Sequence, residues 1–304
     1  MTSTTQAPHT AATRPLDLGA AAIVVFLCLC WGFNQVAVKL ALTDIPPFTQ
    51  AWIRSAGAAL IIWLYARTRG ISLDLRGETL RAGLLAGVLF GLEFIFIYRA
   101  LLYTTASRAT LFIYAAPFVV VLGSHILVPN DRFRWTQWAG LIMSFAGLLL
   151  AFGLPTPSAN ANQLLGDVLA LGGGIAWGLT TLVVKSSSLA QAAPEKTLQY
   201  QLVISAPMLA LAAVLSGETM TQMPGTLPLA SLIYQTVWVV SLTFLIWFTM
   251  VAKYSASRLS AFTFLTPLFG VFAGHLVLGD PITPAFAGAV ALVIGGLILV
   301  NRPR

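Results

Sequence analysis

Two ionisable side chains lie deep inside apolar stretches of this sequence, where they could bind or move charge. Glu93 is the only acidic residue in the body of a predicted helix, and Arg54 lies inside another. At a rise of 1.5 Å per residue, both are expected roughly 12 Å from the same membrane face, so an ion pair between them is geometrically allowed. Ionisable groups are costly in an apolar environment and indicate a functional position by default. Three interpretations stay open: a structural or gating pair, contact with a substrate amine, and proton coupling.

Two tryptophans near the middle of other apolar stretches favour an aromatic binding cavity. Trp31 and Trp177 each begin a Trp-Gly pair, and a polar side chain follows one turn later, Asn34 in the first case and Thr181 in the second. Such polar groups need partners, so we expect both to face the protein interior. Aromatic rings with a few amides and hydroxyls suit a solute that has an apolar body and a polar end. Packing bulk is the competing interpretation of each tryptophan taken alone.

Two prolines also fall near the middle of their apolar stretches. Pro117 follows Tyr114 by three residues, and Pro267 follows Phe264 by three. Because proline perturbs a helix, we expect the prolines to act as pivots and the two aromatic rings to line the cavity. A simple structural kink is the alternative.

Two histidines are candidates for gating or proton transfer. His125 and His275 each lie eleven residues after the aromatic residue of their stretch, which places them on the same helical face, three turns along. The ordinary pKa of imidazole makes histidine a possible relay at physiological pH. The competing interpretation is an interfacial histidine bonded to the backbone or to a loop acid such as Asp280.

The elements that position these residues are membrane-spanning helices. Of the 304 residues, 58% are hydrophobic and 9% charged, whereas a soluble domain carries about 25% charged residues. The apolar residues form blocks of about 20, the length that crosses a hydrocarbon core of roughly 30 Å. We therefore predict an all-α polytopic membrane protein, in contact with the lipid bilayer and without a soluble domain. Ten helices are expected, near residues 18–40, 47–67, 80–102, 105–128, 135–153, 164–186, 195–215, 229–252, 256–278 and 283–300.

The basic residues predict how these helices are oriented. Most of the 17 Lys and Arg residues fall in one set of alternating loops, and only Lys39, Arg99 and Arg108 fall in the other. The positive-inside rule then places both termini in the cytoplasm, with the chain integral to the cell (inner) membrane. Because the charge is scattered among loops, no nucleic-acid partner is expected.

The sequence contains an internal repeat. The passage ASRATLFIYAAPFVVVLGSH, from Ala106, returns as ASRLSAFTFLTPLFGVFAGH, from Ala256, and Trp31 with Lys39 returns as Trp177 with Lys185. Five helices per copy is an odd number, so the second copy must enter the membrane from the opposite side, which gives inverted repeats and two gates about a central site. The expected division is a cytoplasmic tail (1–17), a first five-helix repeat (18–153), a linker (154–163) and a second repeat (164–301).

These features together resemble the drug/metabolite transporter superfamily in its ten-helix EamA form. The residues that carry the resemblance are Trp31-Gly32, Arg54, the Ala-Ser-Arg from Ala106, Pro117, and the matching Trp177-Gly178 and Pro267. Such proteins often carry a Glu after the fourth and ninth helices, where this chain has Asn130-Asp131 and Gly279-Asp280. Tyr98-Arg99-Ala100-Leu101, shortly after Glu93, looks most like aromatic amino-acid exporters of the YddG kind, and this adds Tyr98 to the substrate-binding candidates.

The resemblance implies a secondary transporter, an alternating-access exporter of small metabolites such as aromatic or hydrophobic amino acids. A drug carrier and a nucleotide-sugar or sugar-phosphate carrier of the same fold are alternatives, although a phosphate needs more cationic groups than Arg54 alone. The sequence has no P-loop, so transport is expected to be facilitated or driven by a gradient, with the proton as one candidate. A membrane-embedded enzyme is the remaining alternative, but no G-x-S-x-G, H-E-x-x-H or Cys-rich metal site is present. We expect no cofactor and no metal; export or uptake, and monomer or dimer, stay open.

Overall fold

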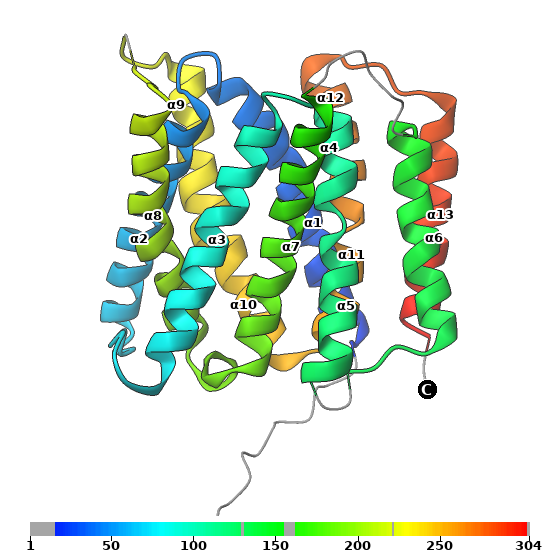
Figure 1. Cartoon of the computed structure of the whole chain (residues 1–304), viewed down its shortest axis with the longest axis horizontal. Coiled ribbons are helices and arrows are strands. Elements are labelled where there is room, and N and C mark those ends of the chain that lie inside the picture. The colour runs from blue at the N-terminus through cyan, green and yellow to red at the C-terminus, as the bar shows by residue number, and fades with distance from the viewer. Residues whose placement is uncertain (1–15, 129–130, 155–161, 221, 303–304) are drawn as a thin grey trace, which may run out of the picture.

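The computed structural model describes residues 16–128, 131–154, 162–220 and 222–302, and over these ranges the chain forms a bundle of helices (Figure 1). The first five crossings are α1 (Leu18–Ala41), α2 (Pro47–Thr68), α3 (Leu80–Ala100), α4 with α5 (Ala106–Ile113 and Ala116–Leu127) and α6 (Trp135–Phe152). The second five are α7 (Gln163–Ser186), α8 (Pro194–Leu215), α9 with η3 and α10 (Thr226–Ile233, Tyr234–Thr243 and Phe244–Lys253), α11 with α12 (Ala256–Phe262 and Leu265–Leu278) and α13 (Pro284–Val300). Two short 3-10 helices lie in loops, η1 (Gly77–Thr79) and η2 (Ser188–Gln191).

Length and composition agree with a membrane bundle. Within the described ranges, eight helical spans of at least 18 residues are apolar enough to cross a membrane. The other two crossings are α13, a shorter apolar helix of 17 residues, and α2, which carries Arg54 and Arg67. The prediction of an all-α fold with ten helices in two inverted repeats is confirmed. Most of the expected tail (1–17) and of the expected linker (154–163) lies outside the described residues, as does Asn130.

The bundle has two opposite faces, at which the helices begin and end. We call the face at which α1 begins and α13 ends the terminal face, and the opposite one the distal face; in Figure 1 the terminal face is at the bottom. Because each repeat has five crossings, α1 runs from the terminal to the distal face and its counterpart α7 runs the other way. For the residues that make a polar contact at one face, the corresponding residues of the other repeat therefore lie at the opposite face.

The fourth and ninth crossings differ from the sequence prediction, because each is broken near its middle. Continuous helices were expected over 105–128 and 256–278, but α4 ends before Tyr114 and α11 ends before Thr263. Each break lies just before a proline, Pro117 or Pro267. A proline has no N–H to donate to the carbonyl four residues earlier, and its ring clashes with that carbonyl. The two breaks are thus the same local event in the two repeats.

The eighth crossing also departs from the expected single helix over 229–252. Its middle part, η3, is a ten-residue π-helix between α9 and α10. A π-helix is uncommon and frequently lies at a functional site. The final residue of η3, Thr243, is fully buried and occupies the position that corresponds to Glu93 in the first repeat.

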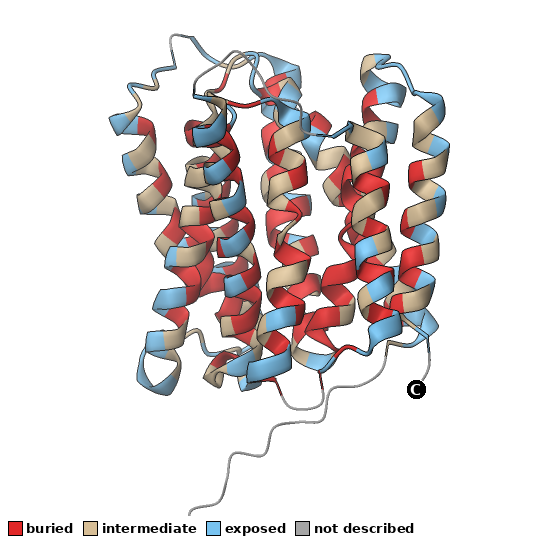
Figure 2. Ribbon diagram, turned by 45° about the vertical axis from the view of Figure 1, so that its right-hand side comes forward, coloured by how far each residue is buried: buried red, intermediate tan, exposed pale blue. Residues whose placement is uncertain are grey.

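Small residues allow the central helices to approach closely. On α3, a Cβ added to Gly87 would lie 2.8 Å from the carbonyl oxygen of Tyr200 on α8, too close for any side chain. Gly83 meets the Tyr200 ring and Gly91 meets Met208 in the same way, so one stripe of α3 packs directly on α8. Figure 2 shows buried residues concentrated in the interior of the bundle and exposed ones toward its outside and its two ends.

Candidate functional site

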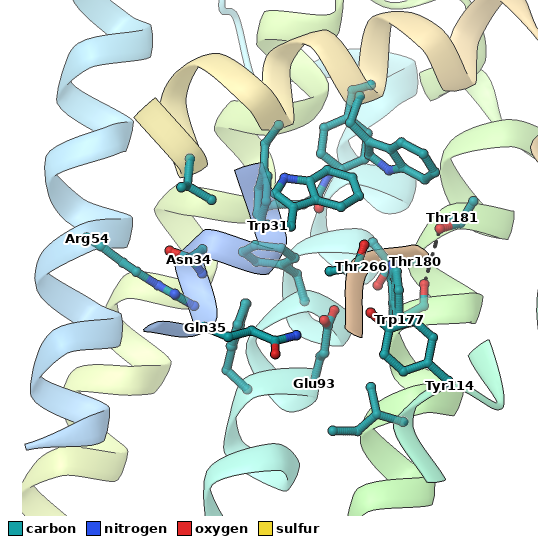
Figure 3. A pocket seen from close by; sticks show the side chains of 18 residues that line it. Trp31, Asn34, Gln35, Arg54, Glu93, Tyr114, Trp177, Thr180, Thr181 and Thr266 are labelled. Atoms are coloured by element: carbon teal, nitrogen blue, oxygen red, sulfur yellow. Dashed lines mark hydrogen bonds between the residues drawn. The ribbon is translucent and has the colours of Figure 1, made fainter. Parts of the chain in front are cut away.

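A cavity of about 210 Å³ lies at the centre of the bundle, between helices of both repeats. Figure 3 shows the side chains that line it. They are Trp31, Asn34, Gln35, Arg54, Phe90, Glu93, Phe94, Ile113, Tyr114, Trp177, Thr180, Thr181, Gln201, Val239, Phe244, Trp247, Phe248 and Thr266. Aromatic rings thus enclose a cavity into which a few polar groups project.

One aromatic wall is built around Trp31 of α1. Its indole Nε1 donates a hydrogen bond to Thr243 Oγ1, with a nitrogen to oxygen distance of 2.9 Å. The indole also contacts two rings of α10 edge to face, with centroid distances of 6.0 Å to Phe244 and 5.4 Å to Trp247. These contacts hold Trp31 in one orientation and join the first repeat to the second.

The opposite wall is built around Trp177 of α7. Its ring meets Tyr114 edge to face at 5.7 Å, and Tyr114 in turn contacts Phe264 at 6.0 Å. Phe264 is fully buried behind Tyr114 and does not reach the cavity. Both rings come from the broken segments of the fourth and ninth crossings, so the two breaks meet behind this wall.

Arg54 and Glu93 both line the cavity, but they are not bonded to each other. Arg54 is 4% exposed, its Nε atom has no hydrogen-bond partner, and its guanidinium carbon lies 4.4 Å from the centroid of the Phe94 ring. Glu93 is 9% exposed. Among the described residues, the ion pairs are Lys39 with Asp280 and Arg108 with Asp167, so the pair that geometry allowed for Arg54 is not formed. A buried guanidinium and a buried carboxyl group are thus left available to a ligand.

Several amide and hydroxyl groups of the lining also have unused bonding capacity. Asn34 Oδ1, Gln201 Oε1 and Thr266 Oγ1 are buried without a hydrogen-bond partner in the described part of the chain. By contrast, Thr180 and Thr181 donate to carbonyls of their own helix, at 2.8 and 3.3 Å; Figure 3 draws the second of these bonds. Because buried polar atoms are normally bonded, the three unpaired atoms are candidates for ligand contacts.

The structure brings together most of the residues that the sequence singled out for binding. Those that line the cavity are Trp31, Asn34, Arg54, Glu93, Tyr114, Trp177 and Thr181. Tyr98 and Phe264 do not line it: the Tyr98 ring packs edge to face against Phe48 at 5.6 Å. The described residues contain no group of three or more His, Cys, Asp or Glu side chains that could hold a metal ion.

Of the residues predicted for gating or coupling, Arg54 lines the cavity, and the prolines and histidines lie away from its lining. Pro117 and Pro267 are buried next to the helix breaks. His125 is exposed near the terminal face and His275 near the distal face. The His275 ring donates from Nδ1 to the carbonyl oxygen of Asp280 at 2.8 Å, which is the local bond that the sequence analysis gave as the alternative to gating.

The sequence analysis missed eleven of the lining residues. They are Gln35, Phe90, Phe94, Ile113, Thr180, Gln201, Val239, Phe244, Trp247, Phe248 and Thr266. The internal repeat carried a signal for three of them, since Gln35, Thr180 and Gln201 occupy the positions that correspond to Thr181, Asn34 and Arg54. For apolar residues such as Val239, nothing in an apolar helix distinguishes a cavity wall from packing.

Comparison with curated proteins finds relatives that span nearly the whole chain. An uncharacterized transporter of Bacillus subtilis, YvbV, is 28% identical over 291 residues, which cover 92% of this chain and 91% of that protein. A probable amino-acid metabolite efflux pump of Salmonella typhimurium is 24% identical over 290 residues, with 91% and 93% covered. A protein with the same description from Escherichia coli is 25% identical over 285 residues, with 90% and 92% covered.

The chain also matches a solved structure and the model of a protein family. The solved structure, described as the crystal structure of a protein, superposes with a TM-score of 0.80 at 21% identity and covers 93% of this chain and 98% of that one, which shows the shared fold. The model of the EamA-like transporter family matches residues 18–153 and 164–302, one range in each repeat. The two matched ranges include all the helices that enclose the cavity. The chain therefore belongs to the EamA-like transporter family.

Proposed function

We propose that this transporter is an alternating-access exporter of amino acids, including aromatic and hydrophobic ones. The observation that supports the proposal is the pair of buried charges in an aromatic cavity, Arg54 and Glu93, which are not bonded to each other. Inverted repeats commonly place a substrate at their interface near the bilayer midplane, and this cavity is lined by helices of both repeats.

The chemistry of the lining matches an amino-acid zwitterion. A guanidinium binds a carboxylate strongly, so Arg54 takes the substrate carboxylate. The Glu93 carboxylate takes the ammonium group, and the rings of Trp31 and Trp177 enclose the side chain. A sugar phosphate is a poorer match, because Arg54 is the only cationic side chain of the lining, which also contains the anionic Glu93.

Other observations support the proposed membrane and the proposed direction of transport. The excess of Lys and Arg in the loops of the terminal face supports a cytoplasmic location for both termini and insertion in the inner membrane. Export is favoured because two relatives are described as efflux pumps for amino-acid metabolites. Facilitated transport and coupling to a proton gradient both remain compatible with this cavity.

The test is a counterflow assay with the purified full-length chain in proteoliposomes. Labelled amino acids, nucleosides and cationic drugs are compared as substrates, and we expect saturable counterflow for aromatic amino acids. Accumulation of a nucleoside or a cationic drug with no amino-acid counterflow would reject the proposed substrate class. Non-saturable flux of every solute would instead indicate a channel.

A charge-removing variant tests the role of the acid in the same assay. Glu93→Gln keeps the shape of the side chain, and we expect it to lose amino-acid counterflow. Glu195→Gln, at the start of α8 on the terminal face, is the matched control and should retain it. If Glu93→Gln transports like the unmodified chain at every pH, Glu93 takes no part in binding or coupling.

A further inference from the structure

The two copies of the repeated passage lie in different environments. At the terminal face, where α10 meets α11, Ala256 and Ser257 are fully buried. At the distal face, where α3 meets α4, the corresponding Ala106 and Ser107 are exposed. The residue types are the same at both junctions, so the difference arises from what packs against them.

Two charged side chains hold the buried junction. The Asp131 carboxylate accepts hydrogen bonds from the Ser255 hydroxyl and, at 3.2 Å, from the Ser257 N–H, at the start of α11. Lys185 Nζ donates to the carbonyl oxygens of Val251 at 2.8 Å and of Tyr254 at 2.9 Å, at the end of α10. An anion at a helix start and a cation at a helix end are both favourable. We call this set of contacts the terminal latch.

The residues of a second latch are present at the distal face, but its contacts are not made. Lys39 corresponds to Lys185, and Asp280 corresponds to Asp131. Their side chains are 64% and 53% exposed and lie 3.9 Å from each other. Thr105 corresponds to Ser255 and, like it, caps its helix, here by accepting from the N–H of Arg108 at 3.3 Å. The junction has the same helix cap as its buried counterpart but not the two charges of the terminal latch; instead, the Asp167 carboxylate accepts from the Thr104 hydroxyl and pairs with Arg108 there.

The cavity lining shows the same difference between the two faces. Gln35, one turn beyond Trp31 toward the distal face, is exposed although it lines the cavity. Its counterpart beyond Trp177, Thr181, lies toward the terminal face and is 2% exposed. The bundle is thus closed at the terminal face and open at the distal face.

We propose that Asp280 and Lys39 form a distal latch when the distal face closes. The Asp280 carboxylate then accepts from the Thr105 hydroxyl and the Ser107 N–H, and Lys39 Nζ donates to the carbonyl oxygens of Leu101 and Thr104. The terminal and distal latches are held alternately, so breaking one shifts the population toward the state that the other stabilises. The proposal rests on alternating access, which is part of the proposed function, but not on any particular solute.

The test measures the exposure of both junctions without a substrate. Reporter cysteines are placed one at a time, as Ala106→Cys or Ala256→Cys, in a Cys28→Ala, Cys30→Ala background of the full chain in nanodiscs, and their reaction with a hydrophilic maleimide is timed. We expect fast labelling at position 106 and slow labelling at 256. Asp131→Asn should speed labelling at 256 roughly fivefold, because losing about one helix-cap interaction raises the small population that is open at the terminal face by that factor, while labelling at 106, where the open state already dominates, slows only slightly.

The decisive step is the second substitution. Adding Asp280→Asn to Asp131→Asn should restore slow labelling at position 256, whereas adding Asp44→Asn should not, because that distal carboxylate bonds to the N–H of Gly225 instead. Fast labelling at 256 that persists in the double variant, or equal restoration by Asp44→Asn, overturns the proposal. Unchanged rates in Asp131→Asn also overturn it.

Lys185→Gln breaks the same latch and replaces Asp131→Asn if that variant fails to fold. Since no solute is present, this outcome is independent of the counterflow result. If the chain labels as expected but transports no amino acid, the proposal of the two latches stands and only the proposed substrate class is rejected.

Discussion

The first repeat places a guanidinium and a carboxyl group in the cavity, whereas at the corresponding register positions the second repeat has an amide that lines the cavity and a threonine that is buried behind it. Arg54 corresponds to Gln201, and Glu93 corresponds to Thr243. Both repeats contribute a tryptophan to the cavity, and the rings of the fourth and ninth crossings meet behind its wall, so the scaffold is symmetric while the ionisable groups are not. The difference teaches that the duplicated fold fixes the scaffold, and that substitutions in one copy give the cavity its polarity.

The largest expected effect comes from removing either charge, since this makes the first repeat resemble the second. Arg54→Gln should weaken amino-acid binding by roughly 10- to 100-fold, the loss of one hydrogen bond to a charged group, but should weaken binding of the decarboxylated amine much less. Glu93→Gln should show the reverse preference, for the acid that lacks the amino group. Competition in the counterflow assay measures both, and equal losses for all three solutes would contradict the assignment of the two polar ends.

A smaller effect is expected from exchanging the two rings that meet behind the cavity wall. Phe264→Tyr places a hydroxyl at a fully buried position and should cost about 1–3 kcal/mol of stability. Tyr114→Phe, the reciprocal change at a residue that lines the cavity, should cost less. Thermal unfolding in detergent measures both, and a Phe264→Tyr variant as stable as the unmodified chain would show that a partner for the hydroxyl exists there.

The smallest effect distinguishes the two tryptophans. Trp31→Phe keeps a ring but loses the hydrogen bond to Thr243, so it should lower stability by about 1 kcal/mol. Trp177→Phe is the matched change in the other repeat and should cost less than Trp31→Phe. A Thr243→Val variant that abolishes the difference between the two would assign it to this bond, and a difference that persists would place its origin elsewhere.

The helices and their inverted arrangement could be predicted because they follow from features of single stretches of sequence. An apolar block of about 20 residues has few alternatives to a membrane helix, and an odd number of crossings fixes the inversion. The predicted limits were wrong where the crossing is not a plain α-helix. Pro117 and Pro267 indicated a perturbation but not a complete break, and nothing in residues 234–243 indicated a π-helix.

The candidate site was predictable for polar residues and much less so for apolar ones. Asn34 and Glu93 stand out because a polar group in an apolar stretch needs a partner. Phe248 does not stand out, because an aromatic residue fits a lipid-facing side, a packed core and a cavity wall equally well. The partner of the Arg54 guanidinium could not be predicted either. The sequence pointed to the Glu93 carboxylate, whereas the guanidinium faces the Phe94 ring.

The two helix breaks have a mechanical consequence. A continuous helix of more than 20 residues tilts as a rod, so that movement at one end displaces the other by a similar amount. The fourth and ninth crossings are instead jointed at mid-length, and their joints touch through Tyr114 and Phe264. Each crossing can bend at its break, so that one of its two segments moves while the other stays packed. The contact between Tyr114 and Phe264 is then the point about which both crossings bend. In the alternating-access cycle proposed above, such bending would change the access to each side with little rearrangement of the cavity walls.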